Sequence, residues 1–128
     1  MMHMKLELVP IPVSDIDRAK KFYVEKVGFH LDHDIAPSEG VRIIQLTPPG
    51  SGCSILLSKG MGEISEMQPG LIKGLHLVVK DVRQMRDALI GRGVEMGEIT
   101  EYPGGIKYSG FGDPDGNSWT FQEIPPKT

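Results

Sequence analysis

The alternation of apolar and polar positions divides the chain into short strand-like segments and two helical ones. Residues 5–13 are rich in Leu, Val and Ile, a composition typical of a buried strand. Ser14 and Asp15 then form a helix-capping signal. Apolar residues follow at helical spacing, and Gly28 is expected to end this helix. The apolar positions are Ile16, Ala19, Phe22, Tyr23 and Val27.

Three further strands are predicted after the first helix, at residues 29–36, 41–47 and 53–58. Turns rich in Pro, Gly and Ser separate them. Residues 59–70 mix Gly, Pro, Met and polar residues without a clear period, so we expect them to connect two halves. The first half therefore has the order βαβββ.

The same order restarts in the second half. Residues 71–79 are predicted to form a strand, and Asp81 opens a second helix that ends near Gly93. Its apolar positions repeat the spacing of the first helix, 66 residues later, at Val82, Met85, Ala88 and Leu89. Three more strands are predicted at residues 94–100, 107–112 and 118–124, and the turn at 113–117 is a strong hairpin signal.

This repetition indicates an internal duplication, with two modules related by a pseudo-twofold axis. We expect a single α+β domain over residues 1–128, with module one at about 5–59, a linker at about 60–70 and module two at about 71–125.

These residues resemble the vicinal oxygen chelate superfamily, which includes glyoxalase I, bleomycin-resistance proteins, fosfomycin-resistance enzymes and extradiol dioxygenases. Residues 14–23, followed by Val27-Gly28-Phe29, are similar to its first helix, and residues 113–117 to its C-terminal signature. Residues 47–54 are similar to a phrase in small bacterial glyoxalase-like proteins. The resemblance implies a curved mixed-sheet cup formed by two βαβββ modules, with helices outside, and a homodimer.

The resemblance also implies where a metal would bind. Enzymes of the superfamily hold it with His, Glu or Gln on the first and last strands of each module. Counting back seven residues from Asp15 and Asp81 places two of these positions at Leu8 and Gly74. The other two fall near Leu56 and at Thr120.

None of these four residues is a normal ligand for a divalent metal, so we expect no metal and no cofactor. A shift of two residues would instead place His76 and Gln122 in the slots of Gly74 and Thr120, which gives a partial ligand set.

Strand alternation predicts which residues line the cup. In residues 71–79 and 118–124 the bulkier apolar face is expected to pack under the helices. The other face then lines the cup, together with Leu6 and Leu8. We predict that a ligand contacts Leu8, Leu56, His76, Tyr108, Thr120 and Gln122, with Ser118 nearby. The alternatives are that the polar set faces solvent on an open sheet and that Tyr108 packs between strands.

Other candidate residues have structural interpretations. His30 and His33 are three residues apart, so they should lie on opposite faces of a strand as exposed histidines. Cys53 has no neighbouring Lys, Arg or His in sequence and is interpreted as a packing residue.

Composition narrows the function classes. Of 128 residues, 39% are hydrophobic and 24% charged, which is ordinary for a globular protein. The net charge is −3 and the basic residues are scattered, which argues against nucleic acid and membrane partners. No apolar run approaches the roughly 20 residues that span a bilayer. A single cysteine suits a reducing compartment, so we expect a cytoplasmic protein.

Three functions remain open. The first is metal-independent binding of a small, partly apolar molecule, comparable to the antibiotic-sequestering proteins. The second is a lyase or isomerase of the glyoxalase type, with displaced metal ligands or with His76 as a general base. The third is a regulatory or assembly subunit with a vestigial cup. The sequence leaves open whether the cup closes within one chain or between two.

Overall fold

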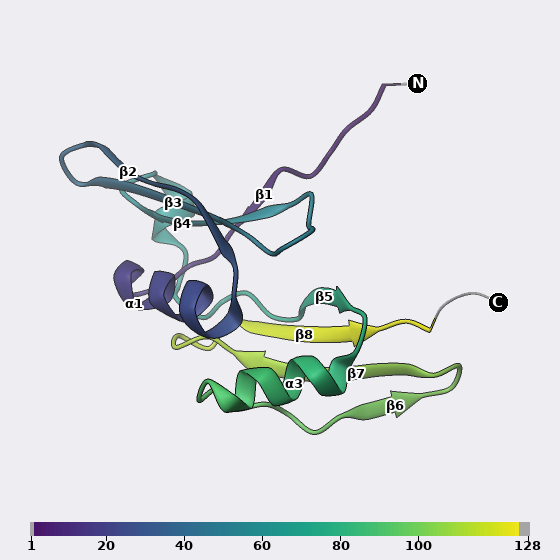
Figure 1. Ribbon diagram of the computed structural model, residues 1–128. Helices are drawn as coiled ribbons and strands as arrows, with labels where there is room; N and C mark the ends of the chain where they lie inside the picture. The colour runs from purple at the N-terminus through teal and green to yellow at the C-terminus, as the bar shows by residue number, and fades with distance from the viewer. Residues whose placement is uncertain (1, 126–128) are drawn as a thin grey trace.

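The computed structural model describes residues 2–125 and consists of two four-stranded sheets (Figure 1). The first sheet has the order β1-β4-β3-β2 and the second the order β5-β8-β7-β6. In each, one parallel pair (β1 with β4, β5 with β8) is followed by antiparallel neighbours. The strands are β1 (Leu8–Pro10), β2 (His30–Ser38), β3 (Val41–Thr47), β4 (Ser54–Lys59), β5 (Leu75–Val79), β6 (Thr100–Tyr102), β7 (Ile106–Gly112) and β8 (Ser118–Glu123).

The helices begin where the capping signals predict. The side chain of Asp15 accepts a hydrogen bond from the Arg18 backbone N–H at 3.0 Å, and Asp81 does the same for Gln84 at 3.1 Å. Gly28 ends the first helical segment with φ at +97°, a conformation that favours glycine. The helical elements are α1 (Ile16–Lys21), the π-helical turn η1 (Phe22–Val27), α2 (Glu63–Glu66) and α3 (Val82–Gly91).

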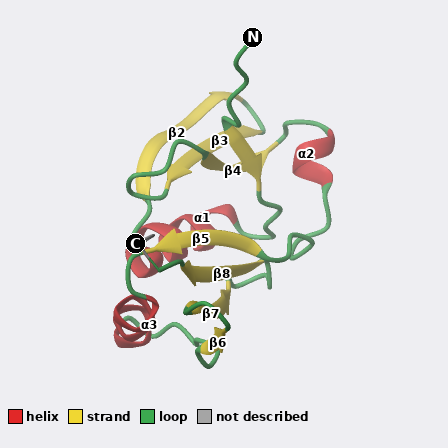
Figure 2. Ribbon diagram, turned by 90° about the vertical axis from the view of Figure 1, so that its right-hand side faces the viewer, coloured by secondary structure: helices red, strands yellow, loops and turns green. Residues whose placement is uncertain are grey.

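One core joins the two modules. The segment α1–η1 lies between the two sheets, and α3 packs on the inward side of the second sheet (Figure 2). Tyr23 of η1 contacts Trp119 of the second sheet, with ring centroids 5.7 Å apart. Buried residues of both sheets meet around this segment: Ile44, Leu46, Ile55 and Leu57 from the first, and Phe111, Trp119 and Phe121 from the second. The expected fold class is confirmed, and the two sheets do not close on each other within the chain.

At two predicted strand segments, regular pairing gives way to isolated backbone hydrogen bonds (Ser118 N–H to Ile72 and Gly97 N–H to Gly110) together with side-chain bonds. The predicted strand at 71–79 begins only at Leu75, because the backbone N–H groups of Ile72 and Gly74 bond to the side chains of Asn117 and Ser118. The predicted strand at 94–100 was wrong. The carbonyl of Gly97 instead accepts from the side chains of Arg86 and Ser109, and regular pairing starts at Thr100.

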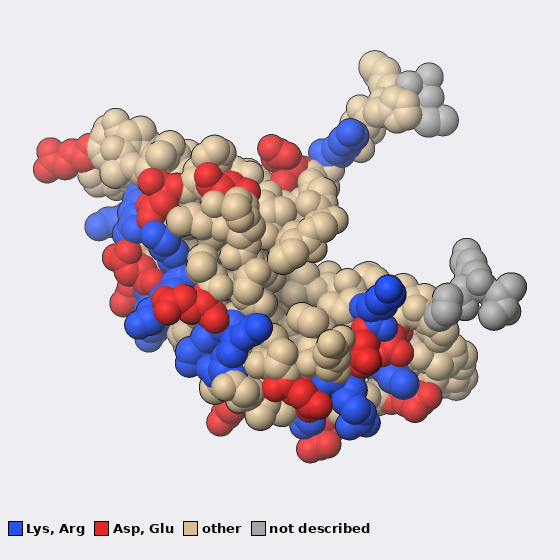
Figure 3. Space-filling model, in the orientation of Figure 1, with Lys and Arg blue, Asp and Glu red and all other residues tan. Residues whose placement is uncertain are grey.

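Charged side chains of both signs are interspersed on the face shown in Figure 3, without a patch of one sign. One group is a defined network at the edge of the first sheet. Asp34 on β2 accepts hydrogen bonds from Arg42 on β3, at 3.0 and 3.1 Å, and from Lys20 on α1, at 2.6 Å. The hydrogen bonds from Arg42 and Lys20 lower the pKa of Asp34 to about 2.

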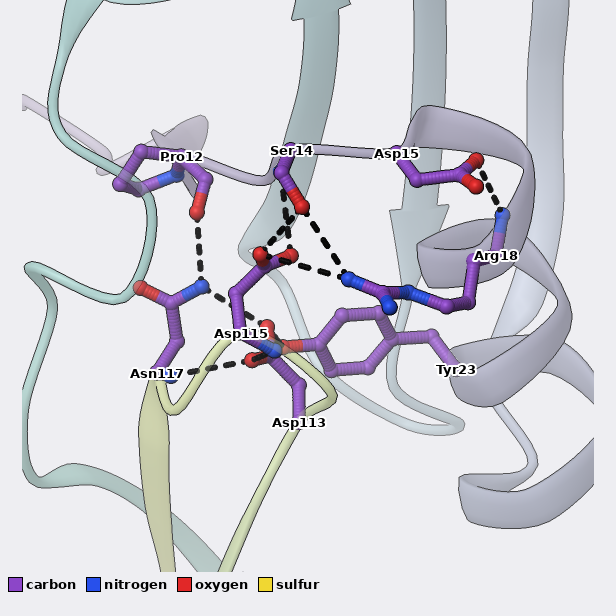
Figure 4. Close-up of polar contacts among 8 residues, drawn as sticks. All are labelled: Pro12, Ser14, Asp15, Arg18, Tyr23, Asp113, Asp115 and Asn117. Atoms are coloured by element: carbon purple, nitrogen blue, oxygen red, sulfur yellow. Dashed lines mark hydrogen bonds and ion pairs between the residues drawn. The ribbon is translucent and has the colours of Figure 1, made fainter.

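A buried carboxylate locks the two modules together (Figure 4). Asp113, in the turn between β7 and β8, accepts from the Tyr23 hydroxyl at 2.7 Å and from the Asn117 side chain at 2.8 Å. Its other oxygen accepts the backbone N–H groups of Asp115 and Asn117. The Asn117 amide also donates to the Pro12 carbonyl in module one at 2.8 Å. The negative charge of Asp113 is thereby compensated in a site that excludes water.

Tyr23 completes this junction as both donor and acceptor. Burial, and next the charge of Asp113, raise the pKa of Tyr23 far above its ordinary value of 10.0, so the phenol keeps its proton and donates it to Asp113. The Trp119 indole N–H donates in turn to the Tyr23 oxygen at 2.9 Å.

We predict that Tyr23→Phe lowers the free energy of unfolding by about 2 kcal/mol, because Asp113 loses a donor and the Trp119 N–H loses its acceptor inside the core. Urea denaturation measures this directly. Tyr102→Phe, at an exposed position, is the matched control and should change stability by less than about 0.5 kcal/mol. Equal stabilities of the two variants would contradict the assigned role of the junction.

Asp34→Asn tests the surface network. The folded-state pKa of Asp34 lies below its ordinary value of 3.8, so its contribution is complete above that pH and is lost as the pH falls toward about 2. We expect the variant to be less stable by up to about 1 kcal/mol at pH 7, with the deficit shrinking between pH 4 and pH 2. Thermal unfolding across this range, with Asp87→Asn on α3 as control, checks the prediction; a deficit that does not vary with pH would contradict it.

Candidate functional site

Each sheet has an outward face, defined here as the face opposite the shared core. On the second sheet this face carries His76, Tyr108, Thr120 and Gln122. Thr120 lies directly opposite His76 in the strand register, and Tyr108 lies opposite Gln122. Their neighbours Trp119 and Phe121 point into the core, which confirms the predicted alternation. The structure therefore brings four of the six predicted ligand-contacting residues together.

The polar groups of this face have defined roles in hydrogen bonding. His76 Nδ1 lies 2.6 Å from the Gly74 carbonyl oxygen. A carbonyl oxygen can only accept, so Nδ1 carries the proton and Nε2 of the neutral ring is an acceptor. The His76 ring meets the Tyr108 ring edge to face at a centroid distance of 5.8 Å, and the Gln122 amide donates to the Tyr108 hydroxyl at 3.4 Å.

The remaining two predicted residues, Leu8 and Leu56, lie on the outward face of the first sheet. Leu8 is opposite Ser54, and Leu56 is opposite both Pro10 and Gln45. Leu56 is buried and Leu8 half-buried. Together they form an apolar surface on the outward face of this sheet.

The structure does not bring these two groups together within one chain. The inward faces of both sheets contribute to the core around α1–η1, so each outward face lies on the side of its sheet away from this core. Large apolar side chains stay exposed on both, with Ile35 at 50% on the first and Val78 at 68% on the second. Each sheet thus presents one open face, and the two sheets do not enclose a cup between them within the chain.

A polar cluster that the sequence did not reveal lies beside Leu8 and Leu56. The Thr47 hydroxyl donates to Asp32, and the hydroxyls of Thr47 and Ser54 are 2.6 Å apart. The Gln45 side-chain amide donates to the Ser54 hydroxyl at 3.2 Å. We call these four residues the Asp32 cluster. Its members belong to β2, β3 and β4, and only their pairing register makes them neighbours.

A β-bulge places Asp32 in this cluster and corrects a prediction about the histidines. His30 pairs with Thr47, whereas His33 pairs with Gln45, which leaves Asp32 as the extra residue. Thr47 and Gln45 share a face, so His30 and His33 share it too, contrary to the expectation of opposite faces. Both are exposed, as expected, and His30 Nε2 lies 3.8 Å from an Asp32 oxygen.

The family's metal positions do not fit a divalent ion in this chain. Leu8 and Leu56 offer hydrocarbon, Gly74 has no side chain, and Thr120 is a poor donor. A shift of two residues along the first strands gives His76 in the second module, but its counterpart in the first is Pro10, opposite Leu56. Within residues 2–125, no group of three or more His, Cys, Asp or Glu side chains could hold a metal.

An apolar cleft of about 410 Å³ lies elsewhere, at the junction of the modules. Val27, Phe29, Pro48, Leu77 and Val78 contribute to its lining. None of the six predicted ligand-contacting residues does, although Val78 also belongs to the outward face of the second sheet. No helix within the described part of the chain is long and apolar enough to cross a bilayer.

Comparison with known proteins identifies the family. The model of the Glyoxalase/Bleomycin resistance protein/Dioxygenase superfamily matches residues 4–121, and the chain belongs to this superfamily. No curated protein gives a match.

Solved structures include similar chains. TnmS3, described as an antibiotic binding protein from Streptomyces sp. CB03234, is 34% identical with a TM-score of 0.81, over 98% of this chain and 99% of TnmS3. A glyoxalase/bleomycin resistance protein from the same organism is 36% identical with a TM-score of 0.77, over 91% and 98%. A superfamily member from Sphaerobacter thermophilus DSM 20745 is 28% identical with a TM-score of 0.82, over 96% and 99%.

Proposed function

We propose that this protein binds a small, partly apolar molecule without a metal, as a homodimer in which two chains complete each binding cup. The observation that carries the proposal is the division of the predicted cup into two outward faces on one chain. Each face combines apolar side chains with a few polar groups, which is the composition of small-molecule sites.

A second copy of the chain supplies the missing wall. A twofold axis can place the first sheet of one protomer opposite the second sheet of its partner, and the same operation then forms a second, equivalent cup. The exposed Ile35 and Val78 would be covered in both. The likeness to TnmS3, an antibiotic binding protein, supports sequestration of an antibiotic-like molecule as the activity.

The absence of suitable donors at Leu8, Leu56, Gly74 and Thr120 supports binding without a metal. Affinity would then come from burial of apolar surface, and the polar residues of the two walls would orient the ligand. The single cysteine, Cys53, is consistent with a cytoplasmic protein.

A second candidate function is proton transfer, as in an isomerase or lyase. It is favoured by one observation, the hydrogen bond from His76 Nδ1 to Gly74, which leaves Nε2 free to accept a proton. Turnover of a bound compound that disappears in His76→Ala, while its binding is retained, would favour this function over sequestration alone.

We predict that the wild-type protein has a mass in solution of twice 14.1 kDa and that Val78→Lys prevents both dimer formation and ligand binding. Val78 is exposed in the single chain, so the substitution should not unfold it, but it places a charge inside the proposed cup. Light scattering after size exclusion measures the mass, and thermal shifts with bleomycin and doxorubicin measure binding.

Ile90→Lys is the matched control for this experiment. Ile90 is an exposed apolar residue of α3, on the side of the second sheet opposite its outward face. The control should remain dimeric and retain any thermal shift. A monomeric wild-type protein, or a Val78→Lys variant that behaves like wild type, would refute the shared cup.

We also predict that protein purified without chelators contains less than about 0.1 equivalent of Zn, Ni, Mn or Fe per chain, because fewer than three donors converge at the family's metal positions. Elemental analysis tests this, and EDTA should leave the thermal shift of any bound compound unchanged. One equivalent of metal that is lost in His76→Ala would show that a displaced site exists.

A further inference from the structure

We propose that the Asp32 cluster makes the first-sheet wall selective for ligands that present a hydrogen-bond donor, such as a phenolic hydroxyl or an amide N–H, and that the carbonyl oxygen of Gln45 receives it. This inference rests on the proposed function, since it assumes that a ligand occupies the outward face of the first sheet. It adds a specificity-determining residue and the chemical class of the group that it recognises.

The hydrogen bonds of the cluster can run in only one direction. An ionised carboxylate accepts hydrogen bonds and cannot donate, so Thr47 donates its single hydroxyl proton to Asp32. In the 2.6 Å contact between the two hydroxyls, Thr47 is then the acceptor and Ser54 the donor. Ser54 has no second proton, so its oxygen must accept from Gln45 at 3.2 Å.

Through Thr47 and Ser54, the charge of Asp32 thus fixes the orientation of the Gln45 carboxamide. Gln45 must point its NH₂ group toward Ser54, and its carbonyl oxygen is left for another partner. Among the described residues no donor is recorded for that oxygen. Gln45 is half-buried, whereas Ser54 beneath it is buried at 7% exposure, so Gln45 is the member of this pair that a ligand can reach.

The surroundings of Gln45 strengthen the preference for a donor. Leu56 lies opposite Gln45, and Leu8 lies opposite Ser54, so apolar side chains flank the polar group. Because these apolar side chains exclude competing water, a hydrogen bond to the Gln45 carbonyl is stronger here than one in solvent. Within residues 2–125, the Asp32 carboxylate forms an ion pair only with the His30 ring, at 3.8 Å, and it adds negative potential on this face. A ligand acceptor placed against the Gln45 carbonyl would be repelled and left unpaired.

The test uses two probes that differ in one hydrogen-bond donor, 1-naphthol and 1-methoxynaphthalene. Their dissociation constants are measured by fluorescence for the wild-type protein, Gln45→Leu, Asp32→Asn and the control Gln84→Leu, in which the same chemical change is made at an exposed position of α3. The informative quantity is the ratio of the two constants within each protein, because solvation differences between the probes cancel when ratios are compared.

We expect the ratio to favour 1-naphthol by about fivefold or more in the wild-type protein and the Gln84→Leu control, relative to Gln45→Leu. Asp32→Asn should also lose most of the preference, because asparagine can donate to Thr47 and allow the chain of hydrogen bonds to reverse. In the wild-type protein, the Gln45 side-chain amide resonances should shift with 1-naphthol more than with 1-methoxynaphthalene, a measurement that requires no variant.

The outcomes separate the two proposals. If both probes bind and the ratio is the same in wild type and Gln45→Leu, the selectivity inference is wrong while the binding function stands. If neither probe binds the wild-type dimer and no thermal shift occurs with any antibiotic, the proposed function fails and the inference fails with it. Unfolding temperatures of all variants establish that the comparison is made between folded proteins.

Discussion

The buried carboxylate of Asp113 needs a hydrogen-bond donor for each of its lone pairs. The hydrogen bonds that satisfy it also fix how the two modules pack against each other. Two backbone N–H groups, an amide and a phenol hold the charge in a site closed to water. The phenol comes from η1 and the amide also binds the chain just before α1, so the turn between β7 and β8 is fixed against the first module. Moving these modules apart would expose the apolar core, and it would remove the Tyr23 hydroxyl from Asp113 and the Pro12 carbonyl from Asn117.

This junction also determines how the two sheets are arranged for the proposed ligand site. Both sheets contribute their inward faces to the core around α1–η1, so their outward faces stay outside this core. In the proposed function, the two sheets therefore carry two half-sites on one chain instead of one enclosed cavity. The apolar cleft between the modules is lined mainly by hydrocarbon side chains, whereas the polar candidate residues lie on the two outward faces.

The sequence predicted those features that depend on neighbouring positions along the chain. Asp15 and Asp81 marked the helix starts, β3 was predicted with its observed bounds, and alternation assigned Trp119 and Phe121 to the core and Thr120 and Gln122 to the opposite face. The resemblance to a known superfamily supplied the topology. Four of the candidate site residues could then be placed on one face of the second sheet.

Features that depend on contacts between distant residues were missed. The bulge at Asp32 shifts the register by one residue, which simple alternation cannot detect, and it changes which side chains share a face. The Asp32 cluster draws on three strands and so has no local signature. In the strand predicted at 94–100, regular pairing starts only at Thr100, and the Gly97 carbonyl bonds to the side chains of Arg86 and Ser109 instead of to a strand.

The difference in polar groups between the two outward faces has an evolutionary consequence for the proposed dimer. One gene would encode both faces of each proposed cup, although each cup takes its two faces from different chains. A single substitution would therefore change both cups of the dimer at once. After gene duplication, two diverging copies that still paired would generate two cups with separate preferences, and a cell could widen the range of compounds it tolerates without evolving a new fold.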